Sequence, residues 1–110
     1  MYLVHAHVRP PDEGSELPPD LRTLLHGYAR PEDGLEHVSV HADAPAGPVL
    51  GLYLLADSLA GAEATATALC TRLLAGDRAF AHWTLLRAEA PLMRLDGPWE
   101  PTGPWGPTGP

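Results

Sequence analysis

The chain has 110 residues, enough for one domain, and its 14 acidic residues outnumber 7 arginines, with no lysine, to give a net charge of −7. Because such a surface repels phosphate and no basic patch interrupts the sequence, no nucleic-acid partner is expected. The amino terminus lacks the basic start and long apolar run of a signal peptide, and no apolar stretch is long enough to span a bilayer. These features predict a cytoplasmic protein without membrane contact.

The first half of the chain predicts a strand followed by a helix. Residues 2–9 alternate with a period of two, which is typical of a strand, and two prolines stop the pattern. Pro18 and Pro19 then open a helix, because proline is tolerated in a first turn. Leucines at helical spacing give this helix one apolar face, and Arg30 ends it before the next proline.

A hairpin, a second helix and a fourth strand follow. Residues 35–41 alternate again, and residues 49–56 are apolar on both faces, as in a central strand. Asp57 and Ser58 supply the N-cap chemistry of a helix that ends near Gly76. Its cysteine, Cys70, is expected to be a small buried hydrophobe. Residues 80–88 alternate once more and predict the last strand.

The element order is strand, helix, strand, strand, helix, strand, which predicts a ferredoxin-like βαββαβ fold of the α+β class. Four antiparallel strands would carry two helices on one face and leave the other face open. The first strand is expected between the third and fourth, with the second at an edge. Residues 1–95 would form this domain, and residues 96–110 a separate extended tail.

The open face is predicted to carry most of the histidines. Alternation places His5, His7 and His82 there as candidate acid/base residues. The candidate pocket residues are His37, Ser39, His41, Tyr53 and Thr84. One intervening strand separates His5 and His7 from His37 and His41 by about 9–10 Å, so His5, His7 and His82 form the favoured trio. Glu36 shares the predicted core face, which is read as the end of an edge strand.

Motifs for specific chemistry are not found. The sequence contains no HExxH, CxxC, GxSxG, Walker or GxGxxG pattern. Histidine clusters can bind metals, but the spacing here favours solvated or interfacial imidazoles. Neither a metal ligand set nor a cofactor is therefore assigned.

At the level of element order, residues 2 to about 90 resemble the dimeric α/β-barrel superfamily, in which ferredoxin-like protomers stack their sheets face to face. The stretches YLVHAHVRP and VLGLYLLADSLAGAEATATAL carry the likeness. This resemblance implies a homodimer formed through the open face, with a pocket between the sheets and the helices. The superfamily includes monooxygenase-like and isomerase-like proteins as well as members without known activity, so the resemblance transfers no catalytic residue.

Three functions follow as hypotheses. The first is a non-catalytic homodimeric accessory protein that binds a small molecule or a partner protein. The second is a cofactor-independent enzyme, monooxygenase- or isomerase-like, that uses a histidine as acid/base in the barrel pocket. The third is a histidine-based metal-binding module.

The predicted tail repeats proline at every third position from 98 to 110. A polyproline II helix has about 3 residues per turn, so Trp99 and Trp105 would share one edge of an extended rod. Such a rod is a possible recognition element for another protein or for the sheet of a second copy. The alternative is an unstructured end that repeats because of codon bias.

Overall fold

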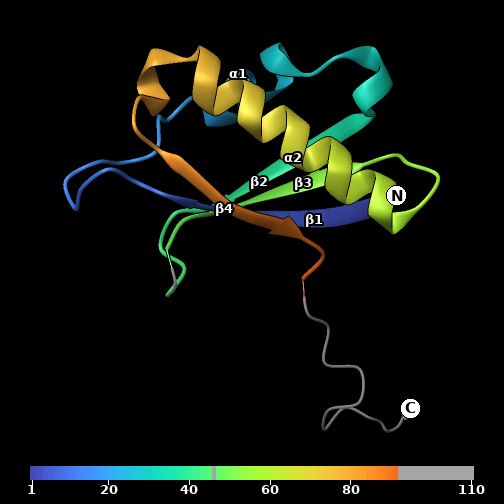
Figure 1. The fold of residues 1–110 in the computed structure, drawn as a ribbon, viewed down its shortest axis with the longest axis horizontal. Coiled ribbons are helices and arrows are strands. Elements are labelled where there is room, and N and C mark those ends of the chain that lie inside the picture. Colours follow the sequence, from blue (N-terminus) through green and yellow to red (C-terminus); the bar gives the residue numbers. More distant parts are fainter. Residues whose placement is uncertain (46, 92–110) are drawn as a thin grey trace, which may run out of the picture.

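The computed structural model describes residues 1–45 and 47–91 (Figure 1). The predicted tail, with Trp99 and Trp105, lies outside these residues. The described part begins with β1 (Tyr2–Arg9), α1 (Leu21–Tyr28), β2 (Leu35–His41) and β3 (Val49–Leu54). It continues with α2 (Leu59–Gly76) and β4 (Thr84–Glu89). Short 3-10 turns at Pro31–Asp33 and Arg78–Phe80 precede β2 and β4, respectively.

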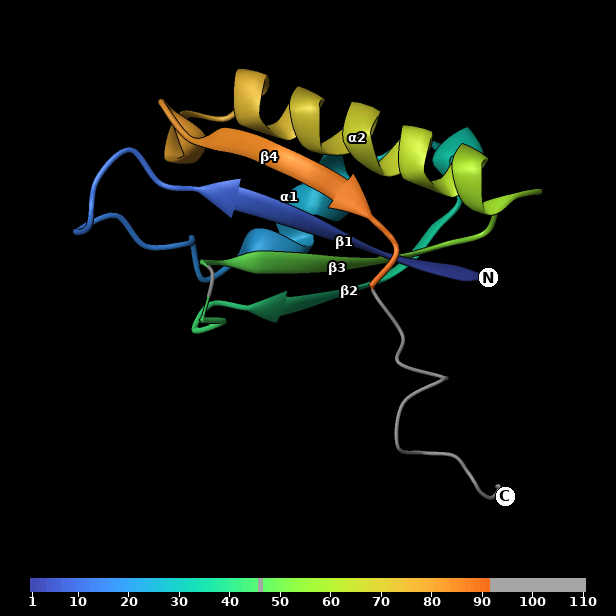
Figure 2. The same cartoon turned by 60° about the horizontal axis from the view of Figure 1, so that its bottom comes forward.

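The four strands form one antiparallel sheet in the order β2-β3-β1-β4 (Figure 2). The sequence correctly placed β1 between β3 and β4, and β2 at an edge. Both helices lie on the same side of the sheet (Figure 1). There α2 packs against β1 and β4, while α1 packs against β2 and α2. The α+β class is thereby confirmed.

The core lies between the helices and one face of the sheet. Inward positions alternate along the strands, as a period of two requires. Its fully buried strand residues are Val4, Ala6, Val8, Val38, Leu50, Leu52 and Leu54. Its fully buried helical residues include Leu25, Ala62, Ala66, Leu69, Cys70 and Leu73. Burying one such leucine contributes about 1.5–3 kcal/mol, so this layer provides the main driving force of folding.

The second helix begins where its sequence predicts. The Ser58 hydroxyl accepts a hydrogen bond from the Gly61 N–H at 3.0 Å, which satisfies one of the free donors of the first turn. The first helix is shorter than predicted and starts at Leu21 rather than at the prolines. In residues 1–45 and 47–91, no helix is both long and apolar enough to cross a bilayer.

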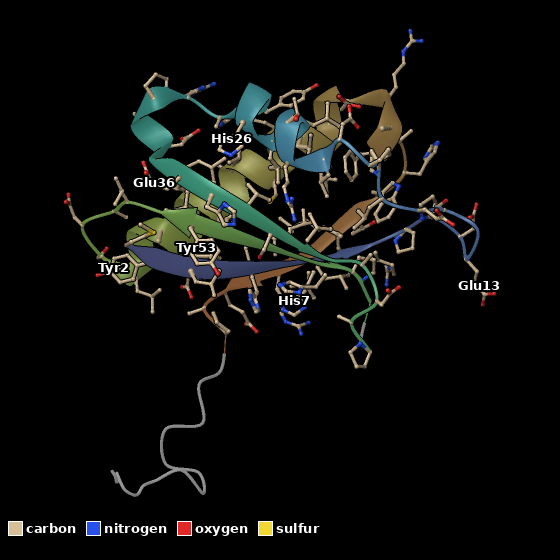
Figure 3. All side chains as sticks on the ribbon, turned by 180° about the vertical axis from the view of Figure 1, so that it is seen from behind. Tyr2, His7, Glu13, His26, Glu36 and Tyr53 are labelled. Atoms are coloured by element: carbon tan, nitrogen blue, oxygen red, sulfur yellow. The ribbon has the colours of Figure 1, made fainter. Side chains whose placement is uncertain are left out.

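Glu36 does not lie on the core face, so that prediction is wrong. The pairing of β2 with β3 shifts by one residue between Leu35 and His37, and Glu36 occupies the bulge with an exposed side chain (Figure 3). Leu35 and Val38 face the core on either side of it. A bulge inserts one unpaired residue, so strict alternation cannot be extended through it.

The fourth strand begins at Thr84 rather than at residue 80. Residues 78–80 form a helical turn, and His82 follows in a left-handed conformation with φ of 70°. A second bulge lies within β4, because Val8 pairs with Leu85 while His7 pairs with Arg87. This shift brings Arg87 to the open face beside Thr84.

Candidate functional site

The face of the sheet opposite the helices is called the open face. It consists of Leu3, His5, His7, Arg9, His37, Ser39, His41, Val49, Gly51, Tyr53, Thr84, Arg87 and Glu89. In Figure 3, Tyr53 and His7 lie on this side, while His26 lies in the helical layer. Leu3 and Tyr53 are only half-buried there, and Leu86, the unpaired residue of the β4 bulge, is 43% exposed.

Strand pairing arranges the open face in three cross-strand rows. The first row is His37, Tyr53 and Leu3. The second row is Ser39, Gly51, His5 and Glu89. The third row is His41, Val49, His7 and Arg87. Imidazoles therefore flank the centre of the sheet, where Gly51 contributes no side chain.

Gly51 explains why two histidines from strands that do not pair come together. The ring centroids of His5 and His41 lie 6.0 Å apart, although β3 separates β1 from β2. A Cβ at Gly51 would collide with the Ser39 hydroxyl and touch Leu3. Since a strand glycine often marks such a close approach, its absent side chain is what lets the neighbours lean over β3.

A hollow opens beside this histidine pair at the end of β2. Its volume is about 570 Å³. The lining residues are His5, Val40, His41, Ala42, Asp43, Ala44 and Val49. The walls are thus mainly small and aliphatic, with two imidazoles and one carboxylate supplying polar groups. This composition is typical of small-molecule sites.

The surroundings of two histidines favour their neutral form. Partial burial lowers the pKa of His5, and the nearby His41 and His7 lower it further. Burial also lowers the pKa of His7, together with the charge of Arg87, while Glu89 acts in the opposite direction. Both rings are therefore neutral at pH 7 and can accept or donate a hydrogen bond.

Close contacts join several polar side chains of the open face. His41 Nε2 lies 3.3 Å from the Ser39 hydroxyl oxygen, a hydrogen bond on the surface of β2. His5 and His7 have ring centroids 6.4 Å apart. Within the described ranges, no group of three or more His, Cys, Asp or Glu side chains is arranged to hold a metal ion.

Six of the eight predicted site residues fall into two neighbouring groups on the open face. His5, His7, Ser39 and His41 gather around Gly51, and the ring of His37 lies 5.3 Å from that of Tyr53 in the neighbouring row.

The predicted trio of His5, His7 and His82 does not assemble. His5 pairs with Glu89 at the far end of β4, while exposed His82 precedes the strand. Thr84 pairs with Arg9, beyond the level of His7. The partner that His5 finds across the sheet is His41.

Sequence reasoning missed Gly51, Asp43, Arg87 and Glu89. The glycine inside an apolar strand was the available signal, since strand glycines mark close approach. The positions of Arg87 and Glu89 depend on the β4 bulge, which alternation does not reveal. Asp43 belongs to a turn whose direction the sequence leaves open.

The fold and the site define an α+β protein with one helix-covered sheet face and one histidine-lined face. Comparison of the chain with protein-family models, curated proteins and solved structures found no significant match.

Proposed function

We propose that the chain is a ferredoxin-like protomer of a homodimer that stacks its two open faces, as in the dimeric α/β-barrel superfamily, and that it binds a small molecule without transforming it. The distribution of apolar groups supports pairing. Helices cover one sheet face, while Leu3 and Tyr53 lie half-buried on the other. Face-to-face stacking of sheets buries such a surface efficiently.

The observation that carries the binding role is the hollow beside His5 and His41. Its aliphatic walls suit an apolar body, and two adjacent imidazoles suit one hydrogen-bonding group of the ligand. An anionic ligand is disfavoured, because Asp43 lines the same hollow and the whole chain is acidic. Stacking a second sheet over this open hollow would shield it from water.

Sedimentation equilibrium tests the dimer directly. The wild-type chain is expected to be dimeric, and Tyr53→Arg should weaken association at least about 100-fold by burying an unpaired charge. Ala68→Arg, at an exposed position on the outer side of α2, is the matched control and should leave association unchanged. A wild-type chain that stays monomeric up to about 100 μM contradicts the proposal.

Binding is tested by NMR titration of the histidine side chains, with benzyl alcohol as the first probe. The resonances of His5 and His41 should shift in a saturable manner, whereas those of exposed His26 should not. Gly51→Leu should abolish the response, because its side chain would occupy the space over β3. A crystal structure in which side chains of the second copy fill the hollow would contradict a ligand role.

A second candidate is a cofactor-independent enzyme that transfers protons in the same hollow. The lowered pKa of His5 favours it, because a neutral imidazole at pH 7 can act as a general base. The hydrogen bond between Ser39 and His41 offers a polar contact for a reacting group. Any candidate activity should disappear in His5→Gln and persist in His26→Gln; persistence in both excludes His5 as the base.

A further inference from the structure

The hollow contains a carboxylate, that of Asp43, which has no counterion among the residues that the structure describes. Asp43 follows β2 in an exposed turn and lines the hollow next to His41. The ion pairs formed by the described residues are Arg72 with Asp33 and Arg87 with Glu89. Neither involves Asp43, so its charge is available to a group that approaches from the open side.

At the opposite edge of the same face, Arg87 has unused donors. Its Nε donates to Glu89 Oε2 at 3.1 Å, and both side chains are about half exposed. An exposed pair of this kind contributes little. Neither terminal nitrogen of the guanidinium forms a hydrogen bond within the part of the chain that the structure describes. Arg87 can therefore bind a second carboxylate while keeping its contact with Glu89.

Strand order allows two aligned ways to stack this sheet on its copy. A two-fold axis along the strands places β2 over the partner's β4 and β3 over the partner's β1. The third row of one subunit then lies over the third row of the other, in the reverse order of strands. His41 and the adjoining Asp43 therefore face the partner subunit's Arg87. In the second row, Gly51 faces the partner subunit's His5, and a ring meets a position without a side chain.

A two-fold axis across the strands gives a different set of neighbours. Each strand then lies over its own copy, so Arg87 stays at the β4 edge and Asp43 stays at the β2 edge. Among the described residues at the β4 edge, the carboxylate offered to Arg87 is that of the partner subunit's Glu89, a residue already paired within its own chain. Asp43 would gain no arginine in this arrangement, and complementarity of charge favours the axis along the strands.

We propose, on the basis of the homodimer proposed above, that the partner subunit's Arg87 closes the hollow by pairing with Asp43. Each hollow is then a composite site, with His5, His41 and Asp43 from one protomer and a guanidinium from the other. The dimer contains two such sites, related by its axis. The small-molecule site is incomplete in a single subunit.

Charge reversal tests this pairing in the full-length protein by sedimentation equilibrium. Asp43→Arg and Arg87→Glu should each raise the dimer dissociation constant at least about tenfold, because each places like charges together. The double variant Asp43→Arg/Arg87→Glu should return to within about threefold of the wild type. Asp57→Arg, at an exposed position preceding α2, is the matched charge control and should have no effect.

A cross-linking experiment gives a second readout. Asp43→Cys and Arg87→Cys are made in separate chains, each in a Cys70→Ala background, and mixed with a short bismaleimide. Covalent dimers should form in the mixture and not in either chain alone, since facing residues of stacked sheets lie about 10 Å apart, too far for a direct disulfide and within the span of the reagent.

The outcomes separate this inference from the proposed dimer. A monomeric wild type overturns both. A stable dimer that both charge reversals leave unchanged overturns only the composite site. If Arg87→Glu/Glu89→Arg restores the dimer dissociation constant and Asp43→Arg/Arg87→Glu does not, the two-fold axis runs across the strands instead.

Discussion

The imidazole rings of His5 and His41 lie 6.0 Å apart between centroids, although β3 runs between their strands. A positive charge on His41 would repel one on His5, and this repulsion contributes to the lowered pKa of His5. His7 adds a third imidazole, 6.4 Å from His5. The open face therefore carries the two histidines whose pKa values are lowered.

The first prediction concerns pH and stability. His5 and His7 have pKa values lowered from 6.5 in the folded chain, so the unfolded chain binds more protons as the pH falls through that region. Their contribution is fully present above the unfolded value and is lost as the pH falls toward the lowered folded values. Groups facing them include His41, Arg87 and Glu89, of which only Glu89 opposes the shift of His7.

Differential scanning calorimetry between about pH 8 and pH 5.5 measures this effect. The melting temperature of the wild type should fall toward acid, and His5→Gln/His7→Gln should show a shallower decline. His26→Gln, which alters an exposed histidine on α1, should keep the wild-type slope. Equal slopes in all three proteins would mean that the open-face imidazoles do not govern the acid response.

The second prediction is a change of sign at Gly51. Replacing glycine by alanine in a strand gains about 0.5–1 kcal/mol from reduced chain entropy. In the wild type the new Cβ collides with the Ser39 hydroxyl, so Gly51→Ala should instead destabilise by about 1 kcal/mol. In a Ser39→Ala background the collision disappears, and the same substitution should stabilise the protein.

Urea unfolding of the wild type, the two single variants and the double variant closes this cycle. The double variant should be more stable than the sum of the two single changes in the free energy of unfolding predicts. Additive changes in the free energy of unfolding would show that the Ser39 side chain rotates away without loss of stability. They would also show that Gly51 is not required for packing over β3.

The sequence alone was enough to predict the order of the helices and strands and the position of β2 at an edge of the sheet. Alternation identified the open-face positions of β1, because that strand pairs on both sides and tolerates no slip along most of its length. It failed where one strand bulges, at Glu36 in β2 and around Leu86 in β4. A bulge depends on the fit between two strands, and one strand's sequence does not contain it.

Prediction of the candidate site was limited by the same cause. His5, His7, His37 and His41 were placed on the correct face, but His82, which precedes β4, was placed there too and was preferred over His41 as the companion of His5. That preference assumed that contact follows strand adjacency. Because Gly51 has no side chain, His5 contacts His41 across β3 and not a histidine of the adjacent strand. Such a contact depends on the size of the residue between the two strands.

The third prediction concerns the ion pair that joins α2 to the turn before β2. Arg72 Nη2 donates to Asp33 Oδ2 at 2.6 Å and to the Tyr28 carbonyl at 3.2 Å. The same carboxylate accepts the Arg30 N–H at 2.8 Å. The side chains of Arg72 and Asp33 are 27% and 12% exposed, so loss of either leaves a partly desolvated partner.

Asp33→Ala should therefore destabilise by about 2 kcal/mol, because it removes the partner of both a guanidinium and a backbone N–H. Arg72→Met should cost only about 1 kcal/mol, since methionine retains the packing and Asp33 keeps the Arg30 contact. Chemical denaturation of both variants measures which one loses more free energy of unfolding. A larger loss in Arg72→Met would indicate that leaving the Asp33 carboxylate without its guanidinium is more destabilising than leaving Arg72 and the Arg30 N–H without the carboxylate.

The fourth prediction concerns the thiol of Cys70. It is fully buried in the α2 stripe that faces the sheet, and burial raises its pKa to about 12. Because the thiolate is the reactive form, the native protein should react with a disulfide reagent at pH 8 at least about 100-fold more slowly than the urea-unfolded protein. Ala68→Cys in a Cys70→Ala background places a thiol on the exposed side of the same helix and should react rapidly without denaturant. Fast modification of native Cys70 would mean that α2 separates from the sheet on the timescale of the assay, and the core beneath it would then open without global unfolding.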